Sequence, residues 1–337
     1  MTTDTISDFN KSPKLSVAKL TGLWAFSECA LGGLLHLFQL PFSGFFLAAF
    51  AVVIICCIYL YSPHPMRDIL YATIVAMTVK LVLSPHTPVT AYVAVGFQGL
   101  SGALICSLPL NNVLKFPLLG VIALVESALQ KVIILTILFG KSMWDAIDAL
   151  ILQVLPGIQS DWSVSATLIL LYAVIYAVWG LIVGLWASNI PKQLANNHEN
   201  YSSFISESSE LVKPKKKKLK TGFWLILGFY ILIFIAITFY FPKEKLFSLL
   251  LRPLLILIVW YFLINPIVKW LINSAYSNNQ GGLKILTDQI TKEIPQMRYQ
   301  ARIAYHQANA KYSGIALLHH FILNLIYLIC LHDPAKS

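Results

Sequence analysis

The sequence predicts an all-α protein that crosses a membrane several times. Of the 337 residues, 57% are hydrophobic and only 12% are charged, and the mean hydropathy is +0.71. Soluble domains are closer to half apolar and a quarter charged. Apolar runs of about 20 residues, the length of an α-helix that crosses the hydrocarbon core, recur along the chain. Together these observations favour a multi-pass protein of the cell inner (plasma) membrane.

The first part of the chain, residues 1–190, is expected to form a six-span membrane domain. Turn residues rich in proline, glycine, serine and asparagine separate its apolar runs, as in Pro41-Phe42-Ser43-Gly44. A short amphipathic helix is expected at 143–155, before the sixth span. The six spans are expected at about 20–40, 45–61, 68–83, 90–108, 116–139 and 164–187.

Residues 191–220 are polar and end in a polybasic run, and they predict a cytoplasmic linker and the main domain boundary. The C-terminal membrane domain, 221–337, is expected to begin with spans at 222–241 and 246–272. A polar, largely helical segment follows at 274–312, with Pro295 as a break. The last apolar run, 314–331, could form a ninth span.

Lysine and arginine in short loops predict the orientation, because they are retained on the cytoplasmic side. If the first six runs each cross, the N-terminus is cytoplasmic, segment 284–311 is inside and the C-terminus is outside. No apolar segment precedes the first span, so no cleavable signal peptide is expected. The positive residues that fall on one side are Lys11, Lys14, Lys19, Arg67, Lys115, Lys192 and the run 213–220.

The formal net charge of +10 owes much to that basic run, which favours contact with anionic lipid headgroups over nucleic acid. No nucleic-acid partner is expected. The five cysteines lie in apolar runs without metal-ligand or disulfide spacing, so they are expected to be packing residues. They are Cys29, Cys56, Cys57, Cys106 and Cys330.

Two lysines inside predicted spans are the main candidate site. An ionisable group at membrane depth costs roughly 2.5 to 3.5 kcal/mol on insertion scales, so it needs a partner, a cavity or a ligand. Lys80 shares a helix face with Thr73, Ala76 and Met77; it either lines a pocket or snorkels to the outer headgroups. We expect a water-accessible pocket for an anionic or polar small molecule.

Lys131 lies deeper than Lys80, on a face with Ser127 and Ile134. Glu126 points roughly 140° away, from 100° per residue, and aligns with Gln130 instead, so it is not a simple partner within one helix. A ligand anion or a bridge to another helix would satisfy Lys131. The pocket hypothesis fails if acids of the chain neutralise both lysines and no hollow lies between the helices.

Further polar and aromatic residues are expected near the outer ends of the spans. They would line the site together with Gln130, or act as membrane-interface anchors. A metal site from two of them, His36 and His86, is weakly supported, since no metal-ligand spacing accompanies them. They include His36, Gln39, His86 and Trp144.

Glu28 flanks a stripe of small residues in the first span, formed by Ala25, Cys29, Gly32 and Gly33. Small residues at this spacing allow another helix to approach closely, either within the bundle or on a partner protein. No phosphate-binding motif or nucleophile elbow is present in the sequence. We therefore expect no enzymatic activity, no catalytic residues, no cofactor and no ATPase within this chain.

Three motifs follow one another in order: Ala30–His36 with Leu40–Gly44, Ala76–Lys80 with Ser84-Pro85, and Ser127–Lys131 with Phe139-Gly140. With six short spans and an inside N-terminus, residues 20–187 resemble the substrate-binding S components of energy-coupling factor (ECF) transporters. The resemblance implies a membrane subunit that captures a vitamin- or cofactor-like solute from outside. Its first helix would dock on a transmembrane T component through Ala25, Glu28, Cys29 and Gly33, and two cytoplasmic ATPases would drive release.

A standard S component stops near residue 190, whereas this chain continues. Lys292–Pro295 and Met297–Arg302 resemble the cytoplasmic helices with which T components grip the ATPases, so Arg298 and Arg302 are expected at a partner interface. The family's Ala-Arg-Gly motif is altered, because Ile303 follows Ala301-Arg302. The alternatives are an interfacial amphipathic helix, or a non-transport membrane scaffold or assembly subunit that acts through this helix.

Overall fold

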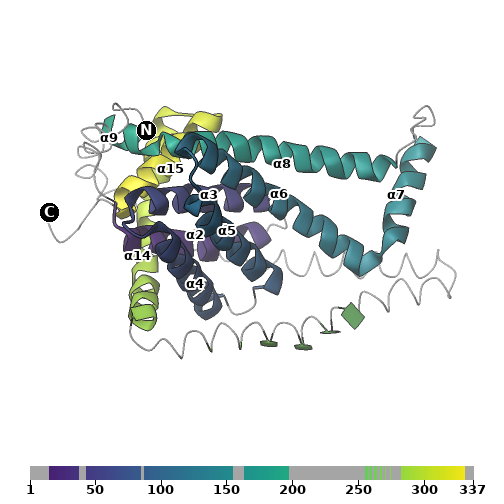
Figure 1. The fold of residues 1–337 in the computed structure, drawn as a ribbon, viewed down its shortest axis with the longest axis horizontal. Coiled ribbons are helices and arrows are strands. Elements are labelled where there is room, and N and C mark those ends of the chain that lie inside the picture. The colour runs from purple at the N-terminus through teal and green to yellow at the C-terminus, as the bar shows by residue number, and fades with distance from the viewer. Residues whose placement is uncertain are drawn as a thin grey trace.

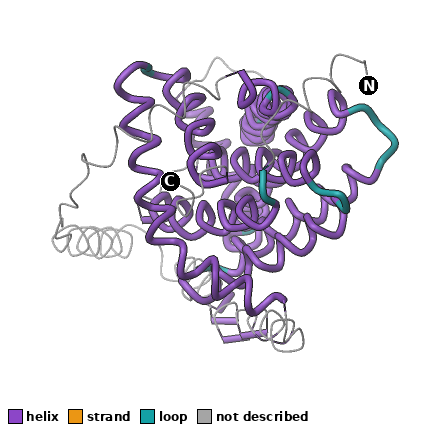
Figure 2. Tube along the Cα trace, turned by 90° about the vertical axis from the view of Figure 1, so that its left-hand side faces the viewer, coloured by secondary structure: helices purple, strands orange, loops and turns teal. Residues whose placement is uncertain are grey.

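A computed structural model describes residues 15–37, 43–84, 87–154, 163–196 and 282–330, with a few separate positions between 255 and 274. The described residues form helices joined by short loops, and no strand occurs among them (Figures 1 and 2). The predicted span 222–241, most of 246–272 and the polybasic run lie outside the described residues.

The six spans expected in the first domain correspond to six helices, each within a few residues of its predicted bounds. Four of them, α3, α5, α6 and α8, are long and apolar enough to cross a membrane. The helices α2 and α4 carry Glu28 and Lys80, and both of these side chains are buried within the bundle. The helices are α2 (Val17–Leu37), α3 (Ser43–Tyr61), α4 (Pro65–Leu83), α5 (Val89–Ser107), α6 (Asn112–Phe139) and α8 (Val164–Ser188).

The helices α6 and α8 cross closely at glycine residues. A Cβ atom added to Gly120 would overlap the backbone of Gly180, and one added to Gly184 would overlap the backbone at Phe116 and Pro117. Small residues at such a crossing let two backbones approach, as in other packed membrane helices. Away from this crossing the two helices diverge, and α7 (Lys141–Val154), the predicted amphipathic helix, connects their far ends (Figure 1).

Two C-terminal helices, α14 (Gly282–Lys311) and α15 (Gly314–Cys330), form an antiparallel hairpin. The Gln300 amide donates to the Leu328 carbonyl oxygen at 3.1 Å, and the Asn324 amide donates to the Ala304 carbonyl oxygen at 3.4 Å. These pairs have the same sum of residue numbers, which is the register of antiparallel helices. Gly314, at φ +60°, makes the turn.

The hairpin lies across the end of the bundle at which α2 begins (Figure 1). On α14, Ile290 and Met297 approach Gly22 of α2, and other buried residues of α14 follow at spacings of three and four. This pattern is that of an amphipathic helix packed along one face. The predicted break at Pro295 is wrong: α14 continues through it, with the proline exposed and the flanking Ile294 and Met297 anchored in the core.

The prediction of a ninth span at 314–331 is corrected in the same way. At 17 residues, α15 is at the lower limit of the lengths that cross a membrane, and it packs along α14, which lies across the end of the bundle, and against α2 and α9 (Ile190–Asn196). Its last half, from Leu323 to Cys330, is buried. Cys330 lies within electrostatic range of Lys19 and Cys57, at the end where α2 begins, rather than at the opposite end expected for an outside C-terminus.

Lys115, expected in a cytoplasmic loop, is instead buried at the start of α6. Its ammonium donates to the Tyr59 hydroxyl at 2.9 Å and to the Cys106 carbonyl oxygen at 3.0 Å. The carbonyls in the last turn of α5 carry the negative end of the helix dipole, which favours a cation there. Lys115 therefore ties α3, α5 and α6 together at this end.

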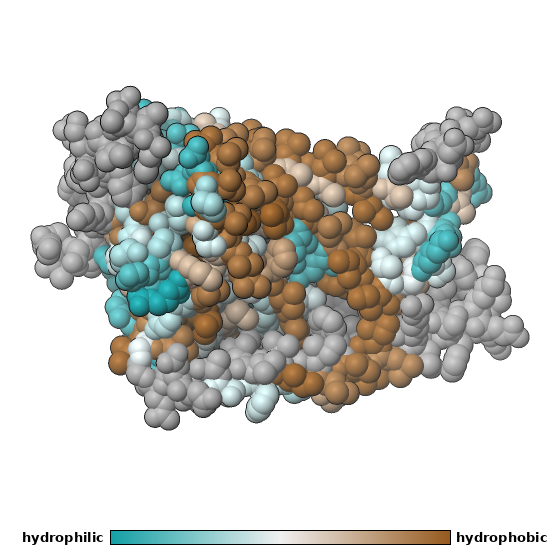
Figure 3. Space-filling model, in the orientation of Figure 1, coloured by the Kyte–Doolittle hydropathy of each residue, from teal (hydrophilic) through white to brown (hydrophobic). Residues whose placement is uncertain are grey.

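The surface has the distribution of polarity expected of a membrane protein. Figure 3 shows a broad hydrophobic surface over α5, α6 and α8, with hydrophilic residues gathered towards the α14 end and near α7. Many exposed leucine, isoleucine and valine residues on α6 and α8 account for the hydrophobic part. Such an apolar surface is unfavourable in water and favourable against acyl chains.

Candidate functional site

A small polar cavity of about 140 Å³ lies among α2, α3, α4, α5 and α6. Residues late in α4 and early in α5 contribute to it, so it lies away from the end covered by α14 (Figure 1). A hydrophilic patch interrupts the hydrophobic surface between α5 and α6 in Figure 3. The lining residues are Glu28, Gly44, Leu47, Ala48, Lys80, Thr90, Ala91, Ala94, Val95, Gln98, Ser127, Gln130, Lys131 and Ile134.

Lys80 and Glu28 form a buried ion pair in the wall of this cavity. The Lys80 ammonium donates to Glu28 Oε2 at 2.6 Å, and each side chain is only 2% exposed. Two opposite charges that leave water together are stable only when each satisfies the other. The snorkelling alternative for Lys80 is therefore wrong, because the side chain turns into the bundle rather than out to the headgroups.

Lys131 contributes a second positive charge to the cavity wall. It lies on the predicted face with Ser127 and Ile134, and all three line the cavity. Gln130 also lines the cavity, and its amide donates to the Thr90 carbonyl oxygen at 2.8 Å, which joins α6 to the start of α5. Glu126 is outside the lining, as the helical angle predicts, and one of its carboxylate oxygens has no hydrogen-bond partner among the described residues.

Gln98 of α5 is a cavity residue that the sequence did not single out. It is 3% exposed, and its side-chain oxygen has no hydrogen-bond donor among the described residues. A buried polar atom without a partner costs free energy, and most buried polar atoms in proteins are paired. The feature of the sequence that could have identified Gln98 is its side-chain amide, since a glutamine within a lipid-spanning helix normally has a hydrogen-bond partner.

The other residues expected at the outer ends do not join the cavity in the described structure. Trp144 lies on α7, where its indole N–H donates to the Thr136 hydroxyl at 2.9 Å, and it is absent from the lining. His36 is in the helical part of α2, but its side chain lies outside the described residues, as do Gln39 and His86. Among the described residues, no group of three or more potential metal ligands is found.

The expected docking stripe on α2 faces the interior. Ala25 and Glu28 are 0% and 2% exposed and Cys29 is 9% exposed, because α3, α4, α14 and α15 surround this helix. These three residues therefore cannot meet a partner protein directly in this conformation, and the expectation of docking through them is corrected. Gly33 lies in the helical part of α2, whose surroundings at that point are outside the described residues.

Arg298 and Arg302, expected at a partner interface, are exposed on the outer face of α14. Lys284, Lys292 and Lys311 are also exposed on α14, against the exposed Asp288 and the half-buried Glu293, so the helix carries an excess of positive charge. The opposite face holds the buried residues that contact the bundle. One face of α14 therefore packs against the bundle, and its other face is exposed at the surface.

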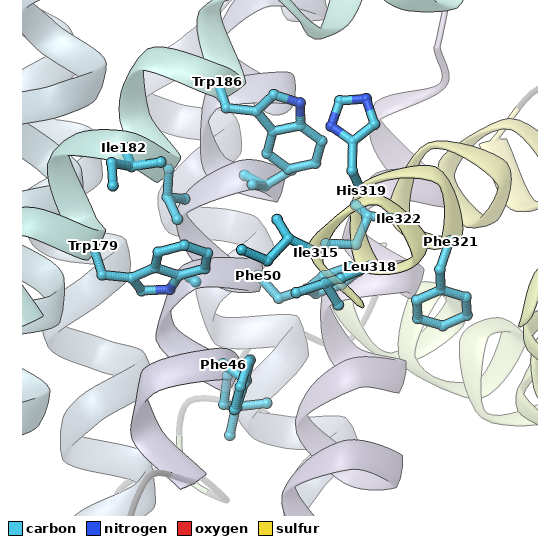
Figure 4. Close-up of a pocket in the computed structure, with 14 residues that line it drawn as sticks. Phe46, Phe50, Trp179, Ile182, Trp186, Ile315, Leu318, His319, Phe321 and Ile322 are labelled. Atoms are coloured by element: carbon cyan, nitrogen blue, oxygen red, sulfur yellow. The ribbon is translucent and has the colours of Figure 1, made fainter. Parts of the chain in front are cut away.

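A second cavity, of about 400 Å³, lies between α3, α8 and α15 (Figure 4). Aromatic and aliphatic side chains form its walls, including Phe46, Phe50, Trp179 and Trp186 in the close-up. His319 is the only ionisable side chain among the described lining residues, with its ring 5.3 Å from that of Trp186. This cavity suits an apolar group, and Ile315 at 80% exposure indicates that it is open at the surface.

No protein-family model matches the chain, and no significant match occurs among curated proteins or solved structures.

Proposed function

We propose that this chain is a membrane subunit of an uptake system, in the role of an S component of an ECF transporter, and that it binds a small polar or anionic solute in the polar cavity. The observation that carries the proposal is a cavity lined by charged and amide side chains, lying among helices several of which are long and apolar enough to cross a membrane. Burying such groups in a bilayer is expensive, and they are retained where they serve a ligand or ion.

The charges of the lining favour an anion. The described lining residues include two lysines, Lys80 and Lys131, and one acidic residue, Glu28, whose carboxylate lies 2.6 Å from the Lys80 ammonium. The cavity is smaller than the 300–1,000 Å³ of sites for drug-sized ligands, at about 140 Å³. A solute of modest size, or the polar end of a larger vitamin-like solute, fits this space.

The apolar cavity is a weaker candidate for the solute site. It is open among exposed apolar side chains on helices that can cross a membrane, so in a bilayer acyl chains would cover it. A charged solute would find no carboxylate, lysine or arginine among the lining residues that the structure describes.

The proposed orientation places the N-terminus and α14 in the cytoplasm and the polar cavity towards the outside. The exposed Arg298 and Arg302 would then be accessible to cytoplasmic subunits, as the resemblance to T components implies. The same exposed face supports the alternative function, a membrane scaffold or assembly subunit that acts through α14. In that case the polar cavity would hold no solute.

Native mass spectrometry of the purified chain tests the proposal. We expect a small molecule bound to the wild type, lost in Lys131→Met, and retained in Lys141→Met, which changes an exposed lysine on α7. A chain without bound solute in all three forms, or one whose bound solute is independent of Lys131, would contradict the proposal. The scaffold alternative predicts that result.

A further inference from the structure

The apolar cavity opens onto the part of the surface that faces lipid. Phe50 of α3 and Val183 of α8, both in its lining, are only 5% exposed, whereas Ile182 and Ile315 at its opening are 47% and 80% exposed. The helices α3 and α8 are long and apolar enough to cross a membrane. The medium at the opening is therefore acyl chains rather than water.

The cavity also separates the first half of α15 from the bundle. The buried residues of α15 begin at Leu323, although the residues before it, such as Ile315, Leu318 and Ile322, are strongly apolar. These three side chains line the cavity, opposite Trp179 of α8 (Figure 4). Cavity walls without neighbouring atoms lose dispersion contacts, so an apolar group in this space would pack α15 against α3 and α8.

We infer that the cavity binds one acyl chain of a phospholipid from the surrounding bilayer. His319 is the only ionisable side chain among the described lining residues, so the cavity offers little to a headgroup, which stays outside. The site holds the hydrocarbon part of the lipid, between α15 and the helices α3 and α8. This inference goes beyond the proposed function and does not depend on a solute in the polar cavity.

The size of the cavity favours an acyl chain over a helix of a partner protein. On each of the three helices the lining extends over seven residue steps, for example from Phe46 to Phe50 and Val53 on α3, which is about 10 Å along the axis. An α-helix with its side chains is about 10 Å or more in diameter, so a 10 Å length of it occupies roughly 800 Å³. The cavity has about 400 Å³, which suits a thinner chain.

Photocrosslinking of the whole chain in nanodiscs tests the inference, with phosphatidylcholine that carries a diazirine in its acyl chain as the probe. Lipid around the protein should label Val178, which is 52% exposed on α8 and is absent from the lining. Only a chain inside the cavity reaches Phe50, because that side chain is 5% exposed. We expect mass spectrometry to find labels at both residues in the wild type.

Two neighbouring residues of α8 provide a filling variant and its matched control. Ile182→Trp should fill the cavity and lose the label at Phe50, while the label at Val178 stays. Leu181→Trp should keep both labels, since Leu181 is equally exposed, at 46%, but is absent from the lining. Ala49→Phe, which fills the cavity from a lining position that is 8% exposed, is the second variant, with the same loss expected.

A wild type labelled at Val178 and not at Phe50 would overturn the inference, because lipid would then surround the cavity without entering it. The same conclusion follows if Phe50 is labelled equally in the wild type and in both filling variants. A native mass spectrum of paired chains, with Phe50 unlabelled, would assign the cavity to a second copy of the protein instead.

Discussion

Lys80 shows how a single residue can be identified from the sequence while its partner is not. A lysine inside an apolar run indicates a buried charge that needs a partner, but the partner, Glu28, is 52 residues away on another helix. The pairing depends on how α2 and α4 pack, and hydropathy carries no information about that arrangement. Lys131 was easier to place, because its neighbours Ser127 and Ile134 follow from the helical period of one helix.

Removing one partner of the Lys80–Glu28 pair should destabilise the fold. We expect Lys80→Met to lower the free energy of unfolding by about 3–5 kcal/mol, because Glu28 would remain as a buried, uncompensated charge. Replacing both residues, in Lys80→Met with Glu28→Leu, should recover most of the loss. Unfolding of the purified variants in detergent micelles measures these values. A double variant as unstable as the single one would contradict the role of the pair.

At the scale of helices, the apolar runs were sufficient to predict the six first-domain helices to within a few residues, because each run must satisfy its backbone hydrogen bonds internally in lipid. They were insufficient for α15. An apolar helix that crosses a membrane and one that packs along α14 have similar composition. Only the contacts with α14, α2 and α9 separate the two cases.

The α6–α8 crossing should tolerate no side chain at its glycines. Gly180→Ala places a Cβ against the backbone of Gly120 and Val121, so we expect a loss of about 1–3 kcal/mol in unfolding free energy. Gly96→Ala is the control, because a Cβ there meets nothing within 4 Å, and it should be neutral or stabilising by up to about 1 kcal/mol. Equal effects of the two changes in a thermal unfolding assay would argue against the crossing.

The α14–α15 hairpin should weaken in acid. Burial lowers the pKa of His319, with the neighbouring His320 adding to the effect, and burial also lowers the pKa of His320. His320 stacks on Tyr312 with ring centroids 3.7 Å apart. Because the folded hairpin binds fewer protons than the unfolded one, its stability is lost as pH falls below the usual histidine pKa of about 6.5.

Thermal unfolding at pH 7.5 and 5.5 measures this dependence. The melting temperature should fall at the lower pH, and the double variant His319→Gln with His320→Gln should fall less. The same decrease in both proteins would show that other groups cause the acid sensitivity.

At the scale of the whole molecule, the two ends of the helix bundle differ in structure. The hairpin of α14 and α15 covers the end where α2 begins, and the polar cavity lies away from it (Figure 1). Charge counts in the loops predicted an orientation, but the burial of Lys115 shows that a lysine near a helix end can serve packing instead. The proposed orientation therefore needs a direct test.

Cysteine labelling in intact cells tests the central claim most directly. All five native cysteines are buried, so most of the maleimide labelling should come from an introduced cysteine. Ala91→Cys lies in the cavity wall and Arg302→Cys on the exposed face of α14. We predict that a membrane-impermeant maleimide labels Ala91→Cys from outside the cell. The rate of this labelling should fall after addition of the small-molecule extract released from the wild-type protein. Arg302→Cys should be labelled only in permeabilised cells. Labelling of Ala91→Cys only after permeabilisation, or at a rate that the extract does not change, would contradict a solute site at the outer face.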